Sequence, residues 1–514
     1  MPVLSKALCC ALCGVEGVLV RVETDVSAGA FLFSLVGLPD AAVRESRDRV
    51  FSALRNSGFL CPTGRVTINL APADLRKEGA AFDLPIALSI LAATGQIPEN
   101  ALDNILLFGE LSLDGSLSPV RGALPMVLSA GEQGVNQTLL PFGNAPEVST
   151  VEGARVYPAR SLRQAAAHLS GRERIPCQAQ VGFDELMKKR GPCAWNLSDV
   201  KGQTGARRAL EIAAAGGHNL LMVGVPGSGK TMLARCLPGI LPEMTAREAF
   251  EVTRIHSVAG LLAAGDGLMT ERPFRTPHHS ASLPSLVGGG ADARPGEISL
   301  AHNGVLFLDE LPEYQRPVLE ALRQPLEDGF VTVSRVRART RYQARCMLVA
   351  SMNPCPCGYH GSRVRPCRCN EHEIAKYLER ISGPLLDRID LQVETDAVPV
   401  DEISSAQKSE SSAAVRERVQ KARAMQVARF SGTQISSNAQ AEGSAVTEFF
   451  PLSIECSAVI LKAVDKLHLS MRAYTRVIKV ARTIADLAGE KEIAPAHLLE
   501  AVSYRTLDNK YWGR

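Results

Sequence analysis

The sequence contains no run of about 18 consecutive apolar residues, the length that a helix needs to cross a bilayer, so we expect no membrane span. Charge of one sign is not in excess either. Lys and Arg number 57 against 54 Asp and Glu, and a net charge of +3 by itself indicates no partner. Cysteine is sparse, with 13 among 514 residues, which argues against a disulfide-stapled scaffold.

A secretory leader is not expected. Residues 7–13 are apolar and follow Lys6, but this run lacks a small-residue cleavage site and passes directly into Gly14. The following residues, 18–24, alternate as a strand does. We therefore expect a cytoplasmic protein.

The chain has the composition of a globular protein, 46% hydrophobic and 22% charged, and its length favours roughly three domains. Residues 1–170 and 195–398 each alternate strand-like and helix-like stretches, which predicts two α/β layer structures. Residues 171–194 are charged and short of periodic apolar residues, so they form the predicted linker.

The remaining part, residues 399–514, is predicted to be helical. Apolar residues recur at helical spacing in 412–430, 455–468 and 471–487. Residues 431–445 are small and polar, and their composition predicts a mobile loop.

A phosphate-binding loop is the strongest signal. Residues 224–231 fit the pattern G-x-x-x-x-G-K-S/T, after an apolar strand and before a helix. Glycines in this setting let backbone N–H groups turn toward phosphate oxygens. Lys230 is expected to neutralise the β- and γ-phosphates of ATP, and Thr231 to ligate Mg²⁺. The candidate ATP-binding residues are Gly224, Val225, Pro226, Gly227, Ser228, Gly229, Lys230 and Thr231.

Two further apolar strands end in polar residues that complete this site. One ends in Asp309 and Glu310. Asp309 is expected to hold Mg²⁺ together with Thr231, and Glu310 to polarise the attacking water. The other ends at Asn353, which a parallel sheet would place beside the γ-phosphate. With the phosphate loop, these residues predict hydrolysis of ATP.

A basic segment lies between Glu310 and Asn353. Five positive charges fall within eleven residues that hold no carboxylate, namely Arg335, Arg337, Arg339, Arg341 and Arg345. The residues around them alternate, which predicts two short strands that fold back near 336–338. One interpretation is a solvated hairpin. The other is a pore loop of a ring, in which Arg335, Arg337 and Arg339 bind DNA phosphates.

Four cysteines form two C-x-C pairs separated by nine residues, namely Cys355, Cys357, Cys367 and Cys369. Four thiolates can supply the tetrahedral ligands of zinc, so a structural Zn²⁺ is predicted, with His360 and His372 as substitute ligands. The alternative is four reduced structural cysteines, because a disulfide is disfavoured in a reducing cytosol. The adjacent His278 and His279 are expected to make loop or DNA contacts, since neighbouring side chains rarely aim at one metal.

These motifs, in this order, resemble an AAA+ ATPase. Residues 37–40 (Gly-Leu-Pro-Asp), 277–279 (Pro-His-His) and 353–358 (Asn-Pro-Cys-Pro-Cys-Gly) extend the resemblance to the ComM/YifB family of magnesium-chelatase-like proteins over nearly the whole chain. The resemblance implies that Asn353 is the sensor 1 residue. Arg388, which alone would be read as a surface salt-bridge partner, matches the arginine finger given in trans to a neighbouring subunit. Arg472 matches sensor 2, with Arg476 as the alternative.

The family resemblance implies a ring-forming, hexameric motor that acts on DNA, as a helicase or in branch migration, during homologous recombination in natural transformation. Related AAA+ helicases carry a hairpin just before sensor 1, where the basic segment lies. The alternative is a chelatase-type ATPase that remodels a protein partner to insert Mg²⁺ into a porphyrin. A third candidate function is ATP-dependent proteolysis.

Residues 77–85 and 109–115 resemble the proteolytic domain of Lon, which needs a Ser–Lys dyad. Ala81 stands where that family has its serine, and no lysine occurs in residues 122–126. Residues 1–170 are therefore expected to lack protease activity and to serve assembly or partner docking. Ser112 and Lys77 are the stand-in candidates for the dyad.

Overall fold

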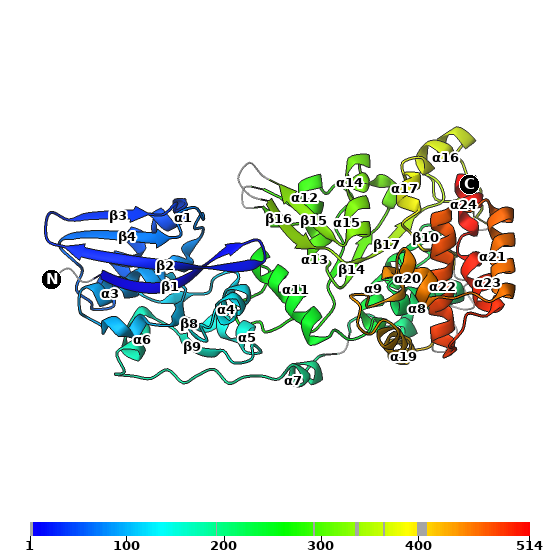
Figure 1. The fold of residues 1–514 in the computed structure, drawn as a ribbon. Coiled ribbons are helices and arrows are strands. Elements are labelled where there is room, and N and C mark those ends of the chain that lie inside the picture. The colour runs from blue at the N-terminus through cyan, green and yellow to red at the C-terminus, as the bar shows by residue number, and fades with distance from the viewer. Residues whose placement is uncertain are drawn as a thin grey trace. The chain divides into compact units, whose positions relative to one another are not determined.

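The computed structural model describes residues 4–191, 193–290, 293–334, 339–362, 365–397 and 409–513. The chain forms two compact units, described separately below (Figure 1). The first combines Met1–Arg190 with Ala246–Thr270, and the second combines Gly191–Thr245 with Glu271–Arg514. Within the described ranges, no helix is long and apolar enough to cross a membrane.

A seven-stranded mixed sheet forms the first unit, in the order β3-β4-β2-β1-β5-β8-β9. β2 runs antiparallel to β1 and β4, whereas β3 pairs parallel with β4, and β1, β5, β8 and β9 pair parallel in turn. Buried and partly exposed residues alternate along β4, as expected for a strand with one face on the core. The bounds are β1 (Leu4–Cys13), β2 (Glu16–Ser27), β3 (Leu32–Val36), β4 (Arg65–Ala71), β5 (Ile105–Leu107), β8 (Gln137–Pro141) and β9 (Arg155–Ala159).

The central helix of this unit is α3 (Asp83–Ala93), whose residues Asp83 to Ala92 are all buried. A helix that is apolar all round is stable only inside a core. The other helices are α1 (Ala41–Arg44), α2 (Ser46–Asn56), α4 (Ala123–Glu132), α5 (Ala145–Val148), α6 (Leu162–Leu169), α7 (Phe183–Lys188) and α11 (Ala246–Ala259). Between β5 and β8 in the sequence, β6 (Glu110–Leu111) and β7 (Leu117–Ser118) form a short antiparallel hairpin.

The second unit contains a five-stranded, fully parallel sheet in the order β11-β14-β17-β10-β18. Its central strands are buried along their whole length, which is why they read as continuous apolar runs. Carboxyl ends of parallel strands share one edge, so the segments after β10, β14 and β17 come together. The bounds are β10 (Leu220–Gly224), β11 (Phe274–Arg275), β14 (Val305–Leu308), β17 (Met347–Met352) and β18 (Leu391–Thr395).

Helices complete this unit and share its core. Buried residues of the sheet and of the C-terminal helices form one hydrophobic cluster, from Leu220 and Phe307 to Val477 and Leu498. The chain is therefore a mixed α/β protein with a parallel sheet and C-terminal helices. The main helices are α8 (Thr204–Gly216), α9 (Lys230–Arg235), α10 (Leu237–Ile240), α12 (Leu283–Val287), α13 (Glu297–Leu300), α14 (Arg316–Ala321), α15 (Arg323–Asp328), α16 (Glu371–Leu378), α17 (Gly383–Leu386), α19 (Ser412–Arg429), α20 (Ser444–Phe449), α21 (Ile454–Leu467), α22 (Met471–Ala488), α23 (Pro495–Ser503) and α24 (Thr506–Trp512). The three helices expected from periodicity correspond to α19, α21 and α22.

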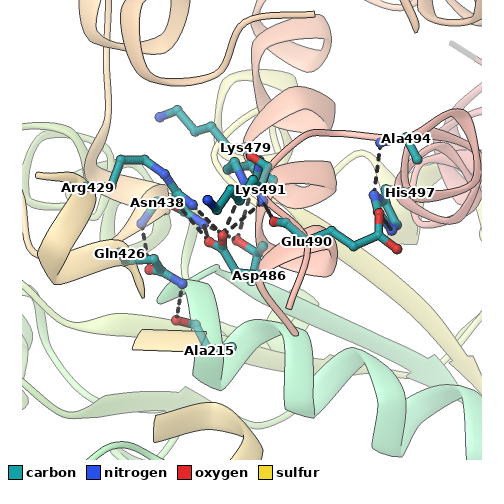
Figure 2. Close-up of polar contacts among 12 residues, drawn as sticks. Ala215, Gln426, Arg429, Asn438, Lys479, Asp486, Glu490, Lys491, Ala494 and His497 are labelled. Carbon is teal, nitrogen blue, oxygen red and sulfur yellow. Dashed lines mark hydrogen bonds and ion pairs between the residues drawn. The ribbon is translucent and has the colours of Figure 1, made fainter. Parts of the chain in front are cut away.

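A buried polar network anchors residues 431–445, which the composition predicted to be a mobile loop. Asn438 is fully buried; its side-chain amide donates to Asp486 of α22 at 2.8 Å, and its backbone N–H donates to Gln426 of α19 at 3.0 Å (Figure 2). Gln426 donates in turn to the carbonyl of Ala215 in α8 at 3.1 Å. Releasing such a group would leave buried partners unsatisfied, so the expectation of a free loop is wrong here.

Candidate active site

The phosphate loop joins β10 to α9 at the carboxyl edge of the parallel sheet. Gly229 takes a left-handed φ of 86°, which disfavours any residue with a Cβ. A Cβ added there would meet no atom of the described residues within 4 Å, so the loop is open on this side. The hydroxyl of Ser228 hydrogen-bonds Thr395 of β18 at 2.8 Å, which ties the loop to the neighbouring strand.

Lys230 reaches back over the loop. Its Nζ donates to the carbonyls of Gly224 at 2.8 Å and Val225 at 3.0 Å, and to Oδ1 of Asn353 at 3.3 Å. Burial lowers the pKa of Lys230 to about 8, which the nearby carboxylate charges, that of Asp309 first, offset only in part. The hydrogen-bond partners of the ammonium are neutral oxygens. Binding of an anion would therefore stabilise its charge. Asn353 lies beside this ammonium, at the carboxyl end of β17, and its predicted place beside the γ-phosphate stays a prediction.

Asp309 receives two hydroxyl hydrogen bonds. Thr231 Oγ1, at the start of α9, donates to Asp309 Oδ2 at 2.9 Å, and Ser351 Oγ donates to Oδ1. Carboxylate and hydroxyl oxygens are the ligands that Mg²⁺ prefers, so the pair of Thr231 and Asp309 fits that ion. Sequence reasoning missed Ser351. Its signal is a lone hydroxyl in the otherwise apolar buried strand β17.

Glu310 stands in a strained backbone conformation beside a histidine. Its φ of 53° and ψ of 51° are left-handed, which is uncommon for a residue with a side chain. Its carboxylate Oε2 lies 3.7 Å from Nδ1 of His279, and its side chain is 55% exposed. Tyr314 holds this neighbouring segment, because its hydroxyl donates to the carbonyl of Pro277 at 2.6 Å. The contact of His279 with Glu310 was not predicted, although a loop contact was expected for the histidine pair.

The two histidine rings contact each other and a neighbouring serine. The His278 ring hydrogen-bonds Ser280 at 2.8 Å and lies against the His279 ring, with centroids 4.1 Å apart. Among the described residues, neither belongs to a group of three or more metal-ligating side chains.

Arg388 is held within its own chain. Its guanidinium donates to the carbonyls of Arg323 at 3.0 Å and Pro384 at 2.8 Å, and pairs with the carboxylate of Glu327. The side chain is 12% exposed. Arg323 and Glu327 belong to α15 and Pro384 to α17, and these contacts leave the trans role a prediction.

The two candidates for sensor 2 have different surroundings. Arg472 is exposed in the first turn of α22. Arg476, one turn later, donates to the backbone carbonyl of Arg388 at 3.3 Å and pairs with buried Asp390. Burial by itself would raise the pKa of Asp390, but Arg476 and the hydrogen bond with His218 hold that pKa well below its usual range. Arg476 is therefore engaged in a buried ion pair.

The basic segment forms the predicted hairpin. β15 (Phe330–Ser334) pairs antiparallel with β16 (Arg339–Gln343), and the guanidinium of Arg341 lies 3.5 Å above the ring of Phe330. Arg335, Arg337 and the side chain of Arg339 lie outside the described residues.

The four cysteines of the two C-x-C pairs come together after β17. The Sγ atoms of Cys355, Cys357, Cys367 and Cys369 all lie within 4.8 Å of one another. Three of the S···S distances are 3.4, 3.6 and 3.7 Å, close to the ~3.8 Å that tetrahedral zinc with Zn–S bonds of about 2.3 Å requires. Hydrogen bonds, first that from the backbone of Arg368, lower the pKa of the Cys357 thiol to about 6, whereas burial raises the pKa of the Cys355 and Cys369 thiols. The backbone N–H of His360 donates to Cys355 Sγ at 3.3 Å. The residues present therefore fit a zinc ion.

The stand-in residues for a protease dyad have separate partners in the first unit. Lys77 is fully buried and donates to the carbonyls of Leu75, at 2.7 Å, and Pro72. Ser112 Oγ lies 3.4 Å from Ser118 Oγ. Ala81 is buried in a short 3₁₀ turn before α3. None of these contacts joins a serine to a lysine.

Three family models match successive parts of the chain. The model described as magnesium chelatase, subunit ChlI, matches residues 196–403. A model described as subunit ChlI of Mg-chelatase matches residues 22–144, and one for the C-terminal part of ChlI matches residues 409–505.

Curated relatives match over almost the full length. The chain is 45% identical to competence protein ComM of Haemophilus influenzae over 495 residues, 96% of each chain. It is 44% identical to the uncharacterized protein YifB of Escherichia coli over 496 residues, again 96% of each. A more distant likeness, 23% over 335 residues, covers 62% of this chain and 38% of DNA replication licensing factor MCM3 of Oryza sativa subsp. indica.

Proposed function

This chain belongs to the ComM/YifB family of magnesium-chelatase-like AAA+ ATPases, and from that premise we propose that it is a ring-forming, hexameric motor that uses ATP to move on DNA. Its role would be helicase activity or branch migration in homologous recombination during natural transformation. The observation that carries the proposal is the hairpin β15–β16, an arginine-rich segment that lies in sequence between β14, which leads to Asp309, and β17, which leads to Asn353. Such a segment couples phosphate binding on DNA to the hydrolysis site. The names of two relatives, a competence protein and a DNA replication licensing factor, support the same direction.

The proposed ATP hydrolysis is assigned to the polar side chains around the phosphate loop. Mg²⁺, when bound, supplies positive charge to the β- and γ-phosphates. Thr231 Oγ1 and the Asp309 carboxylate would hold that ion, while Ser351 fixes the second carboxylate oxygen of Asp309. The ammonium of Lys230 binds phosphate oxygens, and the amide of Asn353 orients the γ-phosphate. Glu310 accepts the proton of the attacking water.

Completion of the site in trans is the second part of the proposal. Arg388 would leave Glu327 and reach the nucleotide of the neighbouring subunit, where a guanidinium stabilises charge in the transition state. Arg472, exposed on α22, would act as sensor 2. Arg476 is the weaker candidate, because moving it would leave Asp390 buried without its ion-pair partner.

Two further features belong to the proposal. Residues 1–170 would form a Lon-protease-like domain without the dyad, followed by a linker at 171–194, and would serve assembly or docking. Residues 195–398 and 399–514 would form the ATPase core and its lid. Cys355, Cys357, Cys367 and Cys369 would hold a structural Zn²⁺, for which one zinc per subunit in a metal analysis is expected.

The test is ATPase activity with single-stranded, duplex and branched DNA, together with mass measurement with and without nucleotide. Stimulation by DNA and assembly into a ring are expected. The alternative, a chelatase-type ATPase that remodels a protein partner, has the family-model descriptions in its favour. A protein that is indifferent to DNA in turnover and in binding would overturn the DNA motor and favour this alternative.

A further inference from the structure

The loop that carries the cysteines also lies against the phosphate loop. Gly358, between the two C-x-C pairs, has a left-handed φ of +84°. A Cβ built on it would lie 2.6 Å from both Cδ and Cγ of Pro226, and 3.8 Å from Cγ of Asn353. Pro226 is the third residue of the phosphate loop, and Asn353 is the partner of Lys230. The absence of a side chain at Gly358 therefore leaves room for Pro226, and Asn353 lies at the edge of the same space.

Gly358 lies in a turn that carries two of the four clustered cysteines. The N–H of Gly358 donates to the carbonyl of Cys355 at 2.9 Å, which closes a turn over residues 355–358. Cys355 is fully buried, and both it and Cys357 place their sulfurs in the cluster. A metal bound by the four thiolates would join this turn to Cys367 and Cys369, so the turn could not withdraw from Pro226. Without the metal, this link to Cys367 and Cys369 is lost, and only weaker hydrogen bonds and packing of the described residues, such as the N–H of His360 on Cys355 Sγ, would hold the turn.

We propose that the four-cysteine site is a positioning element for the phosphate loop: bound zinc holds the turn 355–358 against Pro226 and keeps Asn353 beside Lys230, so nucleotide affinity depends on the metal. This inference rests on the proposed zinc and nucleotide sites. It goes beyond them in assigning the zinc an effect on ATP binding. In the absence of support from the turn, the loop samples other conformations and nucleotide must select the competent one, which weakens the apparent affinity.

Two glycine substitutions distinguish the effect of a clash with Pro226 on nucleotide binding from the effect of backbone strain. Gly361 lies in the same loop with a φ of +73°, but a Cβ there would meet nothing within 4 Å. Gly358→Ala and Gly361→Ala thus impose a similar conformational penalty, while only the first pushes on Pro226. In titrations with a fluorescent ATP analogue, we expect Gly358→Ala to bind about tenfold more weakly than Gly361→Ala, at equal zinc content and equal circular dichroism.

Rescue and metal removal complete the experiment. Pro226→Ala removes both atoms that the new Cβ would meet, so the double variant Gly358→Ala/Pro226→Ala should bind the analogue more tightly than additivity of the single variants predicts. Chelation of the wild-type protein, or Cys367→Ser, should weaken binding along with the loss of zinc. Re-addition of zinc alone should restore it in the wild type.

The outcomes distinguish the inference from its premises. Wild-type protein that binds no ATP analogue would overturn both the proposed ATP site and the inference. Protein that binds the analogue but holds no zinc would overturn the proposed zinc site and the inference with it. If zinc and analogue both bind, yet Gly358→Ala matches Gly361→Ala or the zinc-free protein matches the loaded one, the inference alone is wrong.

Discussion

Nucleotide affinity should fall as pH rises above 8, because Lys230 loses its charge there. Burial lowers the pKa of this ammonium to about 8, and its hydrogen-bond partners are neutral oxygens. Bound phosphate raises the pKa above that value. The charge contribution to affinity is therefore fully present below pH 8 and is lost as pH rises from 8 toward the raised pKa of the complex.

The magnitude follows from that pKa. Before phosphate binds, about nine-tenths of the Lys230 side chains are charged at pH 7 and about one-tenth are charged at pH 9. If phosphate binds the charged form, affinity falls about tenfold between these pH values, or about 1.4 kcal/mol. Excess Mg²⁺ lowers the pKa of the terminal phosphate and keeps it deprotonated over this range, so the charge of the nucleotide is constant.

The assay is a titration with a non-hydrolysable ATP analogue and Mg²⁺ from pH 7 to 9.5 at constant ionic strength. Lys230→Ala should bind at least a hundredfold more weakly, with no such slope. Lys421→Ala is the control, since this lysine is 73% exposed and pairs with Glu417 on α19. A wild-type profile that is flat up to pH 9.5 would show that Lys230 keeps an ordinary pKa and would refute the reasoning.

Three variants test the remaining assignments. Glu310→Gln should bind the analogue as the wild type does but lower kcat by at least about 100-fold, because it cannot accept the water proton; unchanged turnover would remove its assigned role. Arg388→Ala should lower kcat by about 1,000-fold or more while single-subunit nucleotide affinity stays within twofold, and normal hydrolysis would contradict the trans assignment. Replacing Arg335, Arg337 and Arg339 together with Ala should weaken DNA binding and lower its logarithmic salt dependence by about 2 at unchanged nucleotide affinity, as measured by fluorescence anisotropy; an unchanged salt dependence would exclude phosphate contacts there.

Local sequence was enough to locate the phosphate loop and its two companion strands. A loop with Gly229 at positive φ between a buried strand and a helix is a local structure, so its residues can be recognised without knowledge of the fold. The placement of Asn353 near Lys230 needed one rule in addition, that parallel strands end at a common edge. The helices α19, α21 and α22 followed from periodicity for the same reason, since each apolar face is encoded within a few turns.

Contacts between distant segments were missed. Ser351 on Asp309 and His279 beside Glu310 join residues 42 and 31 positions apart, and neither residue has a motif of its own that predicts its partner. Asn438 is a clearer case, because polar composition predicts exposure, while the surrounding helices supply a buried carboxylate that satisfies its amide.

The amino-acid sequence by itself determined the chemistry: which residues can bind phosphate, hold a divalent ion or supply thiolates, because these depend on residue type and short spacing. Only the tertiary structure decided which of them meet. Gly358 reaches Pro226 across 132 positions of chain, and Arg476 rather than Arg472 pairs with Asp390. The physical reason is that such contacts depend on how whole helices and strands pack together. That packing is set by many core residues, and no short sequence pattern determines it.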